Sequence, residues 1–176
     1  AVNAVSLDKA GCITLDSTPD GLAYVAATRE VWVTTPRTKS VTILDATAGA
    51  LTNRKSMTLD GAPEGYAVDS ARGIFYTNLE DKDATLAIDV KSHTVTSTWK
   101  SGCGAEGPRG LAIDPVRKLL VVACTDRLRV MKQGAVVSEL GPDIGPSKGT
   151  FPRRNRIISG LADATVVVEA PARSGA

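Results

Sequence analysis

An internal repeat is the feature that most constrains what this chain of 176 residues can fold into. Three stretches align at spacings of 43 and 45 residues, and each reads as a short apolar strand, a polar turn and a second strand rich in β-branched or aromatic residues. The positions aligned in this way are Val25, Val68 and Ile113, and likewise Arg29, Arg72 and Arg117. Repeats of this length form solenoids, propellers or arrays, so the repeat decides the fold before any single motif does.

The remainder of each copy contains two more strand patterns. Third strands are predicted at 40–45, 84–89 and 127–131, and fourth strands at 51–59, 94–100 and 135–140. Four strands in 43–45 residues are typical of one blade of a β-propeller. No window in this region keeps the apolar i, i+3, i+4, i+7 face of an amphipathic helix. The sequence therefore predicts an all-β fold, a partial β-propeller of about three four-stranded blades near 22–60, 65–102 and 110–140.

Several segments of the repeat resemble a known family. The third strand Val41-Thr-Ile-Leu-Asp45, the fourth strand Thr94-Val-Thr-Ser-Thr-Trp99 and the stretch Cys103-Gly-Ala-Glu-Gly-Pro-Arg-Gly-Leu-Ala-Ile-Asp114 resemble YVTN-family β-propeller repeats. The family's signature is approximated by Tyr76-Thr-Asn78, and the resemblance covers roughly residues 19–140. It implies a propeller fold and leaves the ligand open, because propellers host binders, scaffolds and enzymes alike.

The last 31 residues follow a different pattern. The chain has a formal net charge of +2, which divides into −1 for residues 1–145 and +3 for residues 146–176. After the breaker-rich linker Gly141-Pro-Asp-Ile-Gly-Pro146, a helix is predicted with Pro152 in its first turn, followed by a buried strand over 164–169. We expect two domains: propeller blades at 1–145, and a linker with a short helix–strand segment of α/β, Rossmann-like type at 146–176.

This tail resembles a second family. The string Phe151-Pro-Arg-Arg-Asn-Arg-Ile-Ile-Ser-Gly-Leu161, followed by Val166-Val-Val-Glu-Ala170 and Arg173-Ser-Gly175, closely resembles the DNA-processing protein A (DprA/Smf) family over about residues 149–176. That family has a Rossmann-like domain that binds single-stranded DNA and helps load recombinase during DNA uptake. The candidate nucleic-acid-binding residues are Lys148, Arg153, Arg154, Asn155 and Arg156. The cations among them could track a phosphate backbone. Alternatively, they are solvated residues at the start of a helix.

Three cysteines permit one disulfide. A hairpin in the third copy places residue 124 opposite roughly residue 107, so Cys103 on the incoming loop could pair with Cys124 and add about 3 kcal/mol of stability. Two buried thiols in a reducing compartment are the alternative, and Cys12 has no obvious mate. A disulfide favours a periplasmic or secreted protein, whereas a DNA-processing tail favours the cytoplasm. The compartment stays open.

No catalytic constellation is visible. The chain has no G-x-S-x-G, Walker or H-E-x-x-H motif, and its single histidine, His93, is predicted to be an exposed turn residue. The recurring aspartates are predicted to form turns, at Asp45, Asp69, Asp89 and Asp114. No Cys/His cluster indicates a metal, and no cofactor is expected. We therefore expect a protein that is not an enzyme.

Three functional hypotheses follow. The first is a non-enzymatic binding module that takes an unknown protein or small ligand at blade-end loops near 36–39, 79–83 and 124–127. The second is single-stranded DNA binding through the basic tail, and the third is a fused or truncated product whose parts share no function. Three blades also leave unpaired strand edges, which could close as a homodimer. No apolar run is long enough to span a bilayer.

Overall fold

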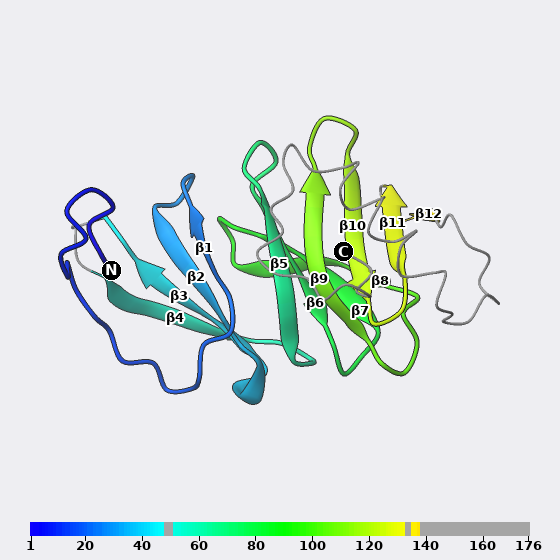
Figure 1. Ribbon diagram of the computed structural model, residues 1–176, viewed down its shortest axis with the longest axis horizontal. Coiled ribbons are helices and arrows are strands. Elements are labelled where there is room, and N and C mark those ends of the chain that lie inside the picture. Colours follow the sequence, from blue (N-terminus) through cyan, green and yellow to red (C-terminus); the bar gives the residue numbers. More distant parts are fainter. Residues whose placement is uncertain (48–50, 133–134, 138–176) are drawn as a thin grey trace, which may run out of the picture.

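The computed structural model describes residues 1–47, 51–132 and 135–137 (Figure 1). These residues form three antiparallel sheets of four strands, each connected in simple sequence order. The first sheet consists of β1 (Leu22–Val25), β2 (Glu30–Thr35), β3 (Ser40–Asp45) and β4 (Thr52–Thr58), with the 3-10 helix η1 (Pro36–Thr38) between β2 and β3. The second consists of β5 (Pro63–Asp69), β6 (Ile74–Leu79), β7 (Ala84–Asp89) and β8 (Thr94–Lys100). The third consists of β9 (Pro108–Asp114), β10 (Leu119–Cys124), β11 (Leu128–Lys132) and β12 (Ala135–Val137).

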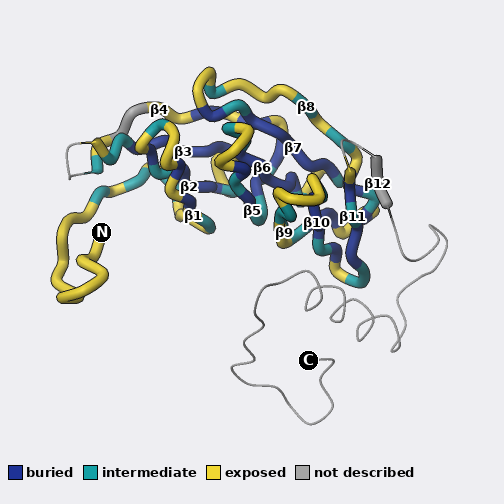
Figure 2. Tube along the Cα trace, turned by 90° about the horizontal axis from the view of Figure 1, so that it is seen from above, coloured by how far each residue is buried: buried dark blue, intermediate teal, exposed yellow. Residues whose placement is uncertain are grey.

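The three sheets stand side by side in an arc. Figure 2 shows β1, β5 and β9 along the inner side of the arc and β4 and β8 along its outer side. Each sheet packs its face against the next, as blades of a propeller do. We therefore call them blades one, two and three. The predicted all-β propeller fold is confirmed, while the predicted helix–strand tail lies outside the described residues. Within the described part of the chain, no helix is long and apolar enough to cross a membrane.

Two apolar cores hold the blades together. Between blades one and two, Trp32 and Phe75 are fully buried with ring centroids 4.9 Å apart, and Ile43 and Ile88 complete the contact. Between blades two and three, the core includes Tyr76, Leu120, Val122 and Met131. Truncating a buried aromatic residue such as Trp32 to alanine costs about 3–5 kcal/mol, so each core is a large share of the stability of such a domain.

The register of blade one differs by one residue from the alignment that the sequence suggests. In the first hairpin of each blade, the strand pair next to the turn is Val25 with Glu30, Asp69 with Ile74, and Asp114 with Leu119, respectively. Val25 is therefore equivalent to Asp69 and not to Val68. A shift of one residue moves a strand side chain to the opposite face of the sheet. In the structure, Val25 faces blade two, whereas Val68 packs back against blade one.

The corrected register also separates the three arginines. Arg72 and Arg117 are equivalent, and each pairs with the aspartate three residues earlier. Arg29 instead occupies the last position of its turn, where Gly73 and Lys118 stand in the other blades. All three of these residues have positive φ angles, of 54°, 68° and 57°. The signal that gives this register is Gly21-Leu22-Ala23, which matches Gly110-Leu111-Ala112 residue by residue.

The backbones of blades two and three approach closely. The side-chain amide of Asn78 donates hydrogen bonds to the carbonyl oxygens of Arg109 (2.7 Å) and Gly110 (3.2 Å). Near it, a Cβ atom on Gly107 would stand 1.7 Å from the carbonyl oxygen of Glu80, so this contact requires glycine. The asparagine that ends the Tyr76-Thr-Asn78 string is thus a link between neighbouring blades.

Candidate functional site

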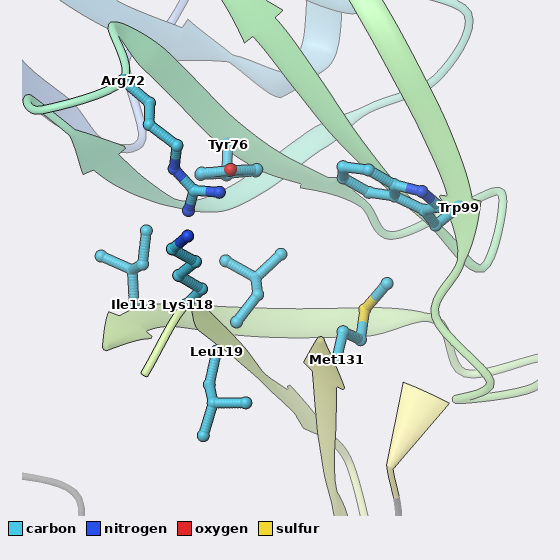
Figure 3. A pocket seen from close by; sticks show the side chains of 8 residues that line it. Arg72, Tyr76, Trp99, Ile113, Lys118, Leu119 and Met131 are labelled. Carbon is cyan, nitrogen blue, oxygen red and sulfur yellow. The ribbon is translucent and has the colours of Figure 1, made fainter. Parts of the chain in front are cut away.

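A cavity of about 90 Å³ lies between blades two and three (Figure 3). Blade two contributes Arg72 from the β5–β6 turn, Tyr76 from β6 and Trp99 from β8. Blade three contributes an apolar wall and Lys118, the last residue of its β9–β10 turn. The residues of this wall are Ile113, Leu119, Leu120 and Met131. The cavity therefore has an apolar and aromatic interior with cationic side chains at one side.

The two cations converge on the same space. In Figure 3 the head groups of Arg72 and Lys118 point toward one another. Arg72 uses its Nε to bond the Asp69 carboxylate, whose side chain is only 2% exposed, and this hydrogen bond raises the pKa of Arg72. Among the described residues, no acceptor lies at the two terminal nitrogens of Arg72 or at Lys118 Nζ. Asp69 balances the charge of Arg72 but not that of Lys118, so the site has an excess of positive charge and favours an anion.

The aromatic residues give the cavity a surface for an apolar group. The ring centroids of Tyr76 and Trp99 are 6.3 Å apart, with their planes tilted by 30°. Burial raises the pKa of Tyr76, so its hydroxyl stays protonated at neutral pH and can donate a hydrogen bond. A cavity that holds benzene measures about 150 Å³. This one is smaller and can take only a small apolar group.

The predicted ligand loops lie at the opposite end of the blades. The two cations of the cavity come from turns that join first and second strands, at the top of Figure 1, whereas the loops near 36–39, 79–83 and 124–127 follow the second strands. An ion pair of 2.7 Å joins Lys39 of blade one to Asp81 of blade two at that end. A second ion pair, Arg109 with Glu80, joins blades two and three. In the structure, these loop residues contact neighbouring blades.

His93 is not the exposed turn residue that the sequence suggested. Its side chain is 13% exposed, and its Nε2 lies 3.2 Å from a carboxylate oxygen of Glu30. The imidazole also meets the edge of Trp32, with ring centroids 5.5 Å apart. The β7–β8 turn folds against blade one, and a positive φ of 55° directs His93 there. Because blade packing is not visible in a turn's composition, the sequence could not indicate this contact.

The remaining candidate residues divide between the described and undescribed parts of the chain. Cys103 and Cys124 form a disulfide with a Cα–Cα distance of 5.3 Å, and Cys12 is an exposed free thiol. The candidate nucleic-acid-binding residues Lys148, Arg153, Arg154, Asn155 and Arg156 lie outside the described residues. No group of His, Cys, Asp and Glu that could hold a metal occurs in the described ranges. Sequence reasoning missed Arg72 and Lys118 as a pair, because only the packing of two blades brings them together.

Comparison with known proteins relates the C-terminal part of the chain to a DNA-processing family. The family model for DNA recombination-mediator protein A matches residues 124–176. Protein Smf of Escherichia coli K12 is 60% identical over 42 residues, which are 24% of this chain and 11% of Smf. Protein Smf of Synechocystis is 46% identical over 48 residues, 27% of this chain and 12% of that protein. The matched segment thus spans about a tenth of these relatives. The match begins at the last residue of β10 and so includes β11 and β12, upstream of the tail predicted from the sequence.

Solved structures share the propeller fold. Kuenenia stuttgartiensis hydrazine synthase is 21% identical with a TM-score of 0.58, over 73% of this chain and 38% of that one. A protein assigned as a 6-phosphogluconolactonase, from Bacteroides fragilis, is 18% identical with a TM-score of 0.58, over 77% and 41% of the two chains. The dihydro-heme d1 dehydrogenase NirN is 13% identical with a TM-score of 0.63, over 78% and 32%.

These structures correct one prediction. We expected a protein that is not an enzyme, because no catalytic motif is visible. However, the structures with this fold include a synthase and a dehydrogenase. The fold therefore accommodates enzymes, and a missing motif does not exclude one. What the comparisons establish for this chain is a propeller fold followed by a segment related to DNA recombination-mediator protein A.

Proposed function

We propose that the blades form a binding module for a small organic anion, with the cavity between blades two and three as its site. The anionic group lies between Arg72 and Lys118, and the apolar part packs against Tyr76 and Trp99. The observation that carries this proposal is the convergence of two cations with no acceptor between them, beside an aromatic interior. This places the ligand at the end of the blades opposite to the loops first considered.

The physical chemistry of the site favours such a ligand. Two like charges that converge repel one another, and an anion between them replaces repulsion with two charge-assisted hydrogen bonds. Each hydrogen bond to a charged group contributes about 1.5–3 kcal/mol. Both cations are at the solvent boundary, so salt weakens their attraction for the ligand. We expect a short aliphatic carboxylate or phosphate monoester to bind.

Titration with butyrate and ethyl phosphate, followed by tryptophan fluorescence, tests the proposal. Trp99 lines the cavity, whereas Trp32, the other tryptophan, is fully buried between blades one and two. The variant Lys118→Asn removes the charge while keeping a residue that tolerates positive φ. We expect about tenfold weaker binding, which corresponds to about 1.4 kcal/mol.

The matched control is Arg117→Gln. Arg117 stands in the same turn and carries the same charge, but it pairs with Asp114 and does not line the cavity. The affinity of the Arg117→Gln variant for both ligands is expected to equal that of the parent chain. If Lys118→Asn and Arg117→Gln weaken binding equally, the effect is one of net charge and the assigned site is wrong. Saturation by neither ligand would also overturn the proposal.

A second candidate function is single-stranded DNA binding through the C-terminal segment. It is supported by the match of the recombination-mediator family model to residues 124–176. Phosphate contacts by arginines release counterions, so the affinity should fall steeply with salt. The triple change Arg153→Ala, Arg154→Ala and Arg156→Ala should abolish binding to an oligothymidylate and flatten its salt dependence. The control removes three exposed lysines from blades one and two, Lys55, Lys91 and Lys100. Equal loss in both variants would contradict a specific role for the tail.

A further inference from the structure

In blades two and three, one face of the sheet packs against the preceding blade. In blade two, Tyr66, Val68 and Phe75 pack against blade one. In blade three, Leu111, Ile113 and Leu120 pack against blade two. The strand registers make these two sets equivalent, position by position. We call this the receiving face of a blade.

Blade one has a receiving face of the same kind, and part of it is open. The equivalent residues are Leu22, Tyr24 and Val31. Leu22 is 62% exposed and Tyr24 57% exposed, although both are large apolar side chains. The N-terminal segment lies along the outer half of this face, where Asp16 and Ser17 line a groove with β3 and β4. The inner half, on β1, is left exposed.

The complementary face occurs on blade three. In blade one, the residues that meet the next blade include Ala23, Trp32 and Ile43, which stand opposite one another on three strands. The same positions hold Ala67, Tyr76 and Ala87 in blade two. In blade three they hold Ala112, Val121 and Val130. Ala112 is exposed, Val130 is partly exposed, and Val121 between them is 7% exposed. All three sets begin with alanine on the inner strand, and the third set is as apolar as the first two.

We propose that a second copy of this chain covers the open face, with blade three of each copy packed on blade one of the other. One chain carries both complementary faces, so the contact is head-to-tail, and two such contacts close a ring of six blades. The contact differs from the strand-edge pairing that the sequence suggested, since the blades meet through faces.

Size-exclusion chromatography with light scattering tests the proposal on the full chain. We expect a mass of about twice the chain's 18.3 kDa. The double variant Leu22→Asp with Tyr24→Asp, and separately Ala112→Lys, should each give a monomer with unchanged far-UV circular dichroism. The matched control is Val116→Asp, at an 87% exposed apolar residue in the β9–β10 turn, outside both faces. It should remain a dimer.

Mixing the two monomeric variants makes the test directional. A mixed pair has one contact free of substitutions, and at the other contact the new carboxylates meet the new ammonium group. We therefore expect the dimer to reappear on mixing. A parent chain that elutes as a monomer overturns the proposal. A dimer that Ala112→Lys leaves intact also overturns it, because the two copies would then meet through their first blades alone.

Discussion

At the scale of single residues, Asn78 shows what the sequence could and could not predict. The string Tyr76-Thr-Asn78 points to a propeller repeat, but only the structure shows the amide bonded to the next blade. In blade one the equivalent residue is Thr34, whose hydroxyl bonds to Gly21 of its own blade. In blade three the equivalent residue is Ala123, whose side chain has no hydrogen-bond donor. The position of Asn78 in a propeller strand was therefore predictable from the repeat. Its hydrogen-bond partner was not, because that partner depends on which blade follows.

Replacing Asn78→Ala should weaken the contact between blades two and three. Asn78 is fully buried and also accepts a hydrogen bond of 2.7 Å from Thr85, so the change leaves buried polar groups without partners. We expect a loss of about 2–3 kcal/mol in the free energy of unfolding, measured by urea denaturation. Thr98→Ala, at an exposed position of β8, is the control and should change stability by less than about 0.5 kcal/mol. Equal losses in both variants would contradict the link.

At the scale of elements, strands and turns were predicted well and the pairing of blades was not. The predicted third strands 40–45 and 84–89 coincide with β3 and β7, because each contains β-branched residues and ends at an aspartate. The turn role of the aspartates is confirmed: for example, Asp114 accepts hydrogen bonds from the backbone N–H groups of Val116 and Arg117. The cavity was missed because its two cations come from turns 45 residues apart whose proximity depends on how two sheets pack.

The aspartates at the turns and blade-end loops predict acid sensitivity. Hydrogen bonds hold the pKa below its usual value in four carboxyl groups: Asp81, mainly from Lys39; Asp89, from Ser92; Asp114, from Arg117; and Asp126, from Arg127. A lowered pKa in the folded state stabilises the protein above the ordinary aspartate pKa of about 3.9, and this stability is lost as pH falls through the folded-state values. Burial raises the pKa of Glu64, which acts in the opposite direction.

The urea midpoint should therefore change little from about pH 7 to 5 and fall below about pH 4. Asp126→Asn removes one of the four carboxylates and should make the fall shallower. A midpoint that rises as the pH drops through this range would show that the turn and loop carboxylates do not control acid stability.

At the scale of the whole molecule, the disulfide and the C-terminal segment meet at one residue. Cys124 ends β10, bonds to Cys103 and is also the first residue matched by the recombination-mediator family model. The sequence predicted the two parts of the chain but placed their boundary after residue 145. It missed the overlap because β11 and β12 satisfy the strand pattern of a blade and the family pattern at once.

Reduction should destabilise blade three. The disulfide joins residues separated by 21 positions, and closing a loop of this length contributes about 3 kcal/mol in the chain-entropy model. We expect the replacements Cys103→Ser and Cys124→Ser together to lower the free energy of unfolding by about this amount. Cys12→Ser, at the exposed free thiol, is the control. An unchanged urea midpoint in the double variant would show that the bond does not stabilise the fold.

The position of the disulfide has a consequence for the order in which the chain assembles on the ribosome. Both of its cysteines, and the whole of the β9–β10 hairpin, emerge before β11 and β12 are synthesised. Blade three can therefore acquire a covalently closed inner half first and receive its outer half later, from the segment shared with the DNA-processing family. Loss of β11 and β12 would leave the β9–β10 hairpin and the loop before it joined by the disulfide.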